Sequence, residues 1–357
     1  MQKVIAKIHL GNIRKNAEQF SALTQKRICA VVKANAYGHG AEEVVNALES
    51  TVDCFAVALI SEGVDIRTCA CGKDILVFTP PLNEREGIAI IQNGFLATIP
   101  DLWTARLIAG IAQRLHIPAR VHLKMNTGMN RYGMNLSMLG KVCKFLQGNE
   151  WVRVEGIYSH LYEYTLVRAQ EQNALFVKAV AVCKRYYPNV ITHLGGTYGA
   201  LISQYLDVDM LRVGIGLYGY IPDGVEENFA DEIARLNLQK GMEVHTMVAL
   251  NRKISYGGVG YGRAWTDEKI KTKKRVYACR FGYADGFLRQ KRNGVVDCEK
   301  NANHLCMDVC LKIGNKRRGE KQAIMTDASE IAKACGTITH EVLCAATRRA
   351  EFVYDNE

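Results

Sequence analysis

The chain has 357 residues, 48% of them hydrophobic, and a formal net charge of +10 at neutral pH. This length suits one large domain and one smaller domain, and no apolar run approaches the roughly 20 residues of a membrane span. The positive charge raises nucleic-acid or membrane-surface binding as an alternative. Because the basic residues are mostly dispersed, we expect neither nucleic acid nor membrane as a partner.

The amino-terminal residues 1–19 lack the apolar core of a signal peptide. Twelve cysteines without paired metal-ligand spacings fit a reducing cytosol. We therefore expect a cytoplasmic protein without a metal site. The sequence leaves open whether Met1 is a natural start or the beginning of the cytoplasmic domain of a larger membrane protein.

Short apolar segments alternate with helical stretches over the first 220 residues. Residues 101–115 carry apolar residues at helical spacing behind a candidate N-cap, Asp101, and residues 167–186 repeat the pattern. The predicted strands are residues 30–36, 54–59, 74–79, 96–100, 120–126, 154–161, 191–195 and 210–218. Eight β-then-α units predict a (β/α)8 TIM-type barrel.

The pattern changes after Tyr220, where the polar segment IPDGVEENFADE follows. Beyond it we predict a smaller, mostly-β domain with one helical segment. Its predicted strands are residues 244–250, 275–281 and 304–312, with a strand-like tail at 351–354. The expected domains are therefore 1–227 for the barrel and 228–357 for the C-terminal β domain.

The first predicted barrel strand leads into ICAVVKANAYGHG, residues 28–40, which places Lys33 at its carboxyl end. A lysine in that position is commonly a solvated residue. Here the amine lies beside Tyr37 and a glycine-containing turn that opens a helix, so it offers a carbonyl nucleophile next to backbone N–H groups. This arrangement suits pyridoxal 5'-phosphate (PLP), which is held on a lysine.

Further polar residues fall at the ends of the predicted strands, the face on which TIM barrels carry their chemistry. They are Lys124, Arg131, His160, His193, Thr197, Arg212 and Gly214. Taken singly, His160 or His193 could equally be a satisfied core histidine. Together with Lys33 on one face, they predict an active site.

On these residues the chain resembles the fold-type III alanine racemases, including the serine-racemase catalytic domains of vancomycin resistance, over nearly its whole length. Several motifs occur in the family's order and with similar spacing. They are VVKANAYGHG (31–40), HLKMNTGMNR (122–131), LRVGIGLYG (211–219), VGYGRAW (259–265), GYADG (282–286) and CMD (306–308).

The resemblance implies that Lys33 forms the internal aldimine with PLP. The residues it implies for the phosphate are Tyr37, Thr197, Gly214 and Ile215. Arg212 is implied to hydrogen-bond the pyridine nitrogen. Because a guanidinium cannot give up its proton, that nitrogen stays unprotonated and the ring is a weaker electron sink, which favours racemisation over transamination. His160 is implied to stack near the ring, and Arg131 to lie by the phenolic oxygen and the substrate carboxylate.

Racemisation needs acid–base groups on both faces of Cα. Lys33 is implied as one, and a tyrosine from the partner subunit as the other. We favour Tyr261 and keep Tyr256 as the lesser candidate, with His193 and Arg212 as the family's relay to it. Met307 is also implied in trans, so the resemblance predicts a homodimer with shared active sites. Tyr283 and Asp308 are implied in supporting positions by the motifs GYADG and CMD.

Some positions depart from the family or leave alternatives open. Lys124 matches a lysine that is carbamylated in some members; the alternative is an ordinary amine paired with an acidic group. Asn126 replaces a usual Asp, and Gly196 a common Asn. His340 aligns with a position, commonly Tyr, at the entrance and phosphate side of the site. Since histidine is smaller than tyrosine, we hypothesise that serine joins alanine as a substrate.

The sequence thus predicts an amino-acid racemase that supplies D-alanine, and by hypothesis D-serine, for peptidoglycan. The alternatives are another barrel-type PLP enzyme, such as a decarboxylase or an aldolase, and a non-catalytic PLP-binding protein. Tyr261 as a second base argues against the first alternative. The predicted β domain argues against the second.

Overall fold

A closed barrel of eight parallel strands forms the larger part of the computed structural model, which describes residues 4–225, 229–254, 259–260, 275–287 and 305–356. This confirms the predicted fold class. The strands are β2 (Arg27–Val31), β3 (Cys54–Val57), β4 (Ile75–Val77), β5 (Leu96–Ile99), β6 (Ala119–Lys124), β7 (Val152–Ser159), β8 (Ile191–Leu194) and β9 (Met210–Val213). The barrel closes because β9 pairs with β2 in parallel.

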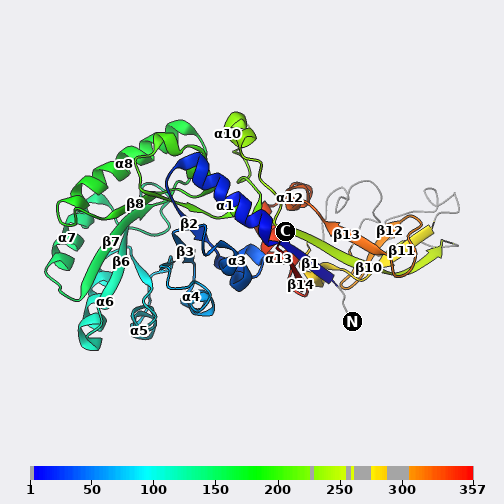
Figure 1. The fold of residues 1–357 in the computed structure, drawn as a ribbon, viewed down its shortest axis with the longest axis horizontal. Coiled ribbons are helices and arrows are strands. Elements are labelled where there is room, and N and C mark those ends of the chain that lie inside the picture. The colour runs from blue at the N-terminus through cyan, green and yellow to red at the C-terminus, as the bar shows by residue number, and fades with distance from the viewer. Residues whose placement is uncertain (1–3, 226–228, 255–258, 261–274, 288–304, 357) are drawn as a thin grey trace. The chain divides into compact units, whose positions relative to one another are not determined.

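Helices follow the strands and lie on the outside of the barrel (Figure 1). They are α3 (Ala41–Leu48), α4 (Ile60–Ile66), α5 (Glu84–Gln92), α6 (Leu102–Leu115), α7 (Leu136–Gln147) and α8 (Leu166–Lys184). The predicted N-cap of α6 is confirmed, since the Asp101 carboxylate accepts a hydrogen bond from the Thr104 N–H at 2.8 Å. None of the helices in the described ranges is long and apolar enough to cross a membrane.

The segment that begins at Lys33 differs from the predicted strand. β2 ends at Val31, and Lys33 begins the short helix α2 (Lys33–Gly38). Four consecutive non-glycine residues of α2, Ala34 to Tyr37, have φ between 53° and 54°, so its turn is left-handed. That conformation costs roughly 1–2 kcal/mol per residue, and a pattern of apolar residues cannot predict it.

Two side chains hold this left-handed turn in place. The Glu62 carboxylate accepts from the Ala34 N–H at 2.7 Å, and the Asn35 side chain accepts from the Ala41 N–H at 2.8 Å. Glu62 lies on the neighbouring helix α4, whereas Asn35 belongs to the turn itself and ties it to the start of α3. Tertiary structure therefore helps to stabilise the turn that carries Lys33.

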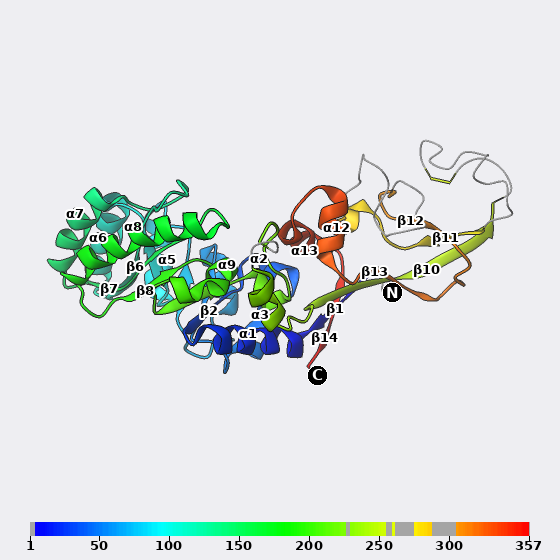
Figure 2. The same ribbon diagram turned by 90° about the horizontal axis from the view of Figure 1, so that it is seen from above.

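A second sheet of six strands contains the C-terminal part of the chain and the first strand, β1. Figure 2 shows β10 as a long strand of this sheet. Its strands are β1 (Val4–His9), β10 (Met242–Lys253), β11 (Arg275–Cys279), β12 (Cys310–Ile313), β13 (Lys321–Met325) and β14 (Glu351–Asp355). All its pairs are antiparallel except β1 with β14.

The mostly-β character of this part is confirmed, but its details differ from the expectation. Two helices, α12 (Ala328–Cys335) and α13 (Thr339–Ala346), stand where one was expected. By packing, the chain forms two compact units: residues 13–36 with 41–239, and residues 1–12, 37–40 and 240–357. The strand β1 belongs to the second unit because β10 and β14 pair with its two edges.

Candidate active site

Four basic side chains act electrostatically on His160 near the carboxyl ends of the barrel strands. Burial is the largest cause of the lowered pKa of His160, and the charges of Arg212, Lys124, Arg131 and Lys33 lower it further. The side chains that contribute most to this shift are all basic. The arrangement therefore suits an anionic ligand.

Lys124, the last residue of β6, is only 8% exposed. Burial lowers its pKa well below the ordinary value, and the charges of Arg212 and Arg131 add to the effect. Its Nζ lies 4.6 Å from the centroid of the Tyr158 ring, and it has no ion pair with a carboxylate within the described ranges. The surroundings favour the neutral amine rather than one paired with an acidic group.

Arg212, on β9, is 3% exposed and, within the part of the chain that the structure describes, donates to three neutral acceptors. Its Nη2 donates to the Ser159 carbonyl oxygen at 2.6 Å and to His160 Nδ1 at 3.3 Å, and its Nη1 donates to His193 Nδ1 at 2.9 Å. A guanidinium has five N–H donors, so donors remain for a ligand. Burial lowers the pKa of Arg212. Arg212 is thus a buried cation with neutral partners and unused donors. It suits a ligand that offers a hydrogen-bond acceptor and carries negative charge.

A layer of aromatic and imidazole rings lies behind Arg212. His193 Nε2 is 3.0 Å from His122 Nδ1, and the Tyr158 ring stacks on His193 with centroids 4.7 Å apart. The Tyr158 hydroxyl donates to Thr98 Oγ1 at 2.7 Å, because the Thr98 hydroxyl donates its own proton to the Val77 carbonyl oxygen. Burial raises the pKa of Tyr158 to about 12. Each ring is thus held by a directed contact.

Sequence analysis missed His122 and Tyr158. The signal for His122 is in β6, ARVHLK, where Arg120, His122 and Lys124 alternate with apolar residues. Since side chains two apart in a strand share one face, His122 lies on the same face of β6 as Lys124. Nothing in the sequence around Tyr158 distinguishes it from a core aromatic residue.

The structure brings Thr197, Gly214 and Ile215 together beside Arg212. Thr197 begins α9 (Thr197–Leu201), and its Oγ1 accepts a hydrogen bond from the Gly216 N–H at 3.1 Å. Gly214 precedes the 3₁₀ turn η2 (Ile215–Tyr218). The backbones after β8 and β9 are therefore tied together, with main-chain N–H groups and a hydroxyl in one place, which suits a phosphate.

Arg131 lies exposed on a loop that folds back on β6. The Met134 N–H donates to the Lys124 carbonyl oxygen at 2.9 Å, and Asn126 Oδ1 accepts from the Asn130 N–H at 3.1 Å. Asn126 Nδ2 also donates to Asn130 Oδ1 at 2.8 Å, a bond that an aspartate could not donate. The unusual Asn126 thus stabilises the loop that carries Arg131.

The comparisons with known proteins decide the family. A sequence model of the alanine racemase N-terminal domain matches residues 8–222, and one of the alanine racemase C-terminal domain matches residues 241–354. The chain belongs to the alanine racemase family. The resemblance inferred from the sequence motifs is thereby confirmed.

Relatives match along almost their full length. An alanine racemase of Clostridium novyi is 30% identical over 388 residues, covering 99% of this chain and 96% of the relative. One of Methanococcus maripaludis is 29% identical, covering 98% of each chain. The solved alanine racemase of Clostridium difficile has a TM-score of 0.89 at 29% identity, covering 100% of this chain and 97% of that one.

In the second packing unit of this alanine racemase family member, His340 on α13 lies near Tyr37. Their ring centroids are 5.8 Å apart and the rings are tilted by 47°. Burial is the main cause that raises the pKa of Tyr37, so its hydroxyl stays protonated and available as a donor. The structure thus brings together two residues predicted for the cofactor.

The two C-terminal motifs GYADG and CMD also lie side by side. The Tyr283 N–H donates to the Cys306 carbonyl oxygen at 3.1 Å, and Asp308 accepts from both terminal nitrogens of Arg349 at 3.0 and 3.1 Å. Met307 is 54% exposed, which suits a residue offered to another molecule. The two candidate bases, Tyr256 and Tyr261, lie outside the described residues.

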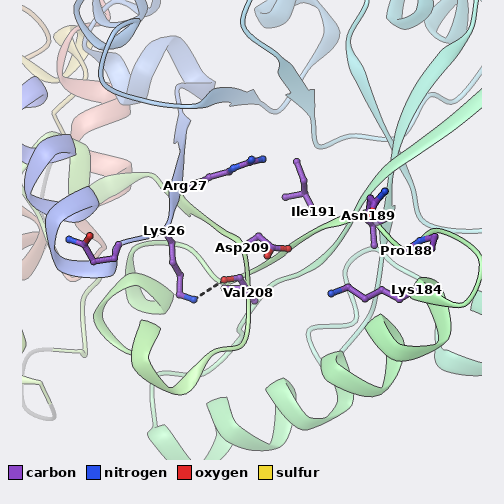
Figure 3. Close-up of a pocket in the computed structure, with 10 residues that line it drawn as sticks. Lys26, Arg27, Lys184, Pro188, Asn189, Ile191, Val208 and Asp209 are labelled. Carbon is purple, nitrogen blue, oxygen red and sulfur yellow. Dashed lines mark hydrogen bonds between the residues drawn. The ribbon is translucent and has the colours of Figure 1, made fainter.

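A cavity of about 620 Å³ lies at the opposite end of the barrel (Figure 3). Its lining comes from the start of β2, β8 and β9 and includes Lys26, Arg27 and Lys184. Lys26 Nζ donates to the Val208 carbonyl oxygen at 2.7 Å. None of the predicted site residues that the structure describes lines this cavity, so it is not the candidate active site.

Lowering the pH from 7 to 5 should destabilise the fold through His122 and His193. Burial lowers the pKa of His122 to about 3 and that of His193 well below its usual range, so both are neutral when folded. Their stabilisation is complete above the unfolded pKa of about 6.5 and falls as the pH drops toward the folded value. At pH 5 His122 should cost about 2 kcal/mol of unfolding free energy, and His193 should act in the same direction.

Urea unfolding at both pH values measures this effect, with the variant His122→Phe beside the wild type. The variant should lose about 2 kcal/mol less between pH 7 and pH 5. An equal loss in the two proteins would contradict the neutral state of His122.

Proposed function

We propose that this chain is a PLP-dependent racemase that interconverts L- and D-alanine by a two-base mechanism and supplies D-alanine for peptidoglycan. The observation that supports this most is Arg212, a buried cation whose three hydrogen-bond partners among the described residues are all neutral. An acceptor with no proton of its own, such as a pyridine nitrogen, fits its spare donors. The proposal includes a cytoplasmic location, which depends on the family resemblance.

The described residues offer what PLP requires. Lys33 would hold the cofactor covalently, Thr197 with the main chain at Gly214 and Ile215 would bind its phosphate, and Tyr37 would donate a hydroxyl. The guanidinium groups of Arg131 and Arg212, whose charges both act on His160, would attract the phosphate and the substrate carboxylate. When bound, PLP supplies the electron sink that makes the Cα proton removable.

Two groups of the chain would move the proton. Lys33 Nζ would take or return it on one face of Cα, and the Tyr261 hydroxyl of a second subunit on the other. Arg131 would orient the substrate carboxylate. This arrangement requires a homodimer, so a dilution series that retains full activity in the monomer would rule it out.

The alternatives are less well supported. A decarboxylase or aldolase would not need a second base opposite Lys33. A single-barrel PLP carrier would lack a C-terminal domain, whereas residues 241–354 match the family's C-terminal domain.

Incubation with L-alanine and L-serine, followed by chiral analysis, tests the activity. Wild-type protein should bind PLP with the absorption of the covalently held cofactor and yield racemate, and Lys33→Ala should lose both. Tyr261→Phe should retain the absorption but lose about 10²–10⁴ in rate, the usual share of an acid–base group. The matched variant Tyr256→Phe should keep the rate. Absorption without turnover in the wild type would favour a carrier.

We also propose that serine is a second substrate, admitted by His340. A histidine at this position beside Tyr37 leaves more room than a tyrosine and can donate or accept a hydrogen bond. His340→Tyr should raise the alanine-to-serine ratio of kcat/KM by about 10- to 200-fold. His245→Tyr, on β10, is the matched control and should leave it unchanged. An unchanged ratio in both variants removes the idea.

Carbamylation of Lys124 is the third part of the proposal. A neutral buried amine can attack CO₂, forming an N–C bond and losing a proton to solvent, and the resulting anion would balance Arg131 and Arg212. Protein kept in ¹³C-bicarbonate should show a carbamate carbonyl resonance that is absent from Lys124→Met. Lys141→Met, at an exposed lysine of α7, is the control. A spectrum without this resonance refutes the modification.

A further inference from the structure

Arg212, His193 and His122 form a chain of hydrogen bonds that can run in only one direction. Arg212 has no acceptor atom, so it donates to His193 Nδ1 at 2.9 Å. Neutral His193 must then carry its proton on Nε2 and donate it to His122 Nδ1 at 3.0 Å. His122 is therefore an acceptor at Nδ1. This series of hydrogen bonds cannot conduct a proton, because the Arg212 guanidinium does not release one. Its effect is to hold the three side chains in place.

The barrel makes a specific space for His122. The residue is 2% exposed on β6, and its ring lies against Gly156 of β7. A Cβ at Gly156 would fall 2.7 Å from His122 Nδ1 and Cε1, closer than side-chain contacts allow. The β6–β7 register also shifts between Val121 and His122. The imidazole thus fills a place shaped for it beside His193.

The competing interpretation is that His122 merely fills the barrel core. A filler needs volume and shape but not a lone pair on Nδ1. His193 is 0% exposed, so without this acceptor its Nε2–H would be buried unpaired, and the imidazole would be free to turn away from Arg212. Substitutions can remove the acceptor and the volume of His122 separately. The two interpretations then predict opposite rankings of the variants in kcat and PLP affinity.

We propose that His122 is a positioning residue of the racemase: by accepting the Nε2–H of His193 it fixes the imidazole that holds the Arg212 guanidinium in place for the ring nitrogen of the cofactor. This inference rests on the proposed function. His122 lies two positions before Lys124, and His193 and Arg212 would connect it to the ring nitrogen of the cofactor.

Two substitutions separate the acceptor from the volume. His122→Phe keeps a ring in the space beside Gly156 but has no acceptor, whereas His122→Asn is smaller and can place Oδ1 near the position of Nδ1. We expect kcat and PLP affinity to be highest in the wild type, lower in His122→Asn and lowest in His122→Phe. Phe should lower kcat about tenfold with little change in KM, and weaken PLP binding by a similar factor, while Asn recovers most of both.

Pyruvate release is a readout that loss of packing would not move. If Arg212 no longer holds the ring nitrogen, that nitrogen can take a proton and the ring becomes a stronger electron sink. The amino group of alanine then passes more often to PLP, giving pyruvate and pyridoxamine phosphate. Pyruvate released per racemisation event should rise in His122→Phe and stay near the wild-type value in His122→Asn.

Thr192→Val is the matched control, since it removes a side-chain hydrogen bond of a buried residue in the neighbouring part of the barrel, on β8. Thr192 Oγ1 donates to Asp209 at 2.7 Å, and its side chain lies on the strand face opposite to that of the adjacent His193. It should lower stability without changing the pyruvate ratio. A pyruvate ratio raised as much in Thr192→Val as in His122→Phe would overturn the proposal.

Nitrogen-15 spectra of histidine-labelled protein without cofactor supply a test independent of activity. His193 should show a protonated Nε2 coupled through the hydrogen bond to His122 Nδ1, and this coupling should vanish in His122→Phe. If Phe matches or exceeds Asn in kcat and PLP affinity, or if the coupling is missing in the wild type, the role of His122 is wrong. Failure of the wild type to bind PLP or racemise would instead refute the proposed function and leave the coupling intact.

Discussion

The charge of Arg212 is buried without a carboxylate partner among the described residues, and the site depends on this constraint. Removing a cation from water is costly unless other groups replace its hydration. Here a carbonyl oxygen and two neutral imidazoles do so, and they keep the charge available. A carboxylate partner would have satisfied the guanidinium and left less for a ligand. Burial is the main cause that lowers the pKa of His160 and His193, and the neighbouring charge of Arg212 lowers both further.

The barrel supports this arrangement through alternation along its strands. The inward positions of β6 carry Arg120, His122 and Lys124. One strand therefore places three polar side chains at successive levels along the barrel axis. Arg120 forms ion pairs with Asp74 and Glu155 near the amino end of the strand, whereas Lys124 has no such partner in the described part. Positive charge is therefore neutralised by carboxylates at the amino end of the barrel strands. At the carboxyl end it is left in excess, and an anionic ligand would neutralise it there.

Much of the fold and part of the site follow from the sequence. The eight barrel strands were predictable because each is a short apolar run between helical patterns, and the motif residues fall at their ends. Lys33 shows where this reasoning stops. The apolar run extends past Val31, but Glu62 of α4 and the turn's own Asn35 accept hydrogen bonds that stabilise a left-handed turn instead of further strand. The pairing of β1 with β10 was also beyond reach, because strand partners far apart in sequence leave no local signal.

By itself the sequence determined the fold class, the family and the identity of the residues at the strand ends, because those depend on local periodicity and on motifs. Only the tertiary structure decided how these residues act on each other. It placed Lys124 away from any described carboxylate, gave Arg212 three neutral partners, and set His122 behind His193. Burial, neighbouring charge and hydrogen-bond direction are properties of packed side chains, and they decide which protons the site can hold.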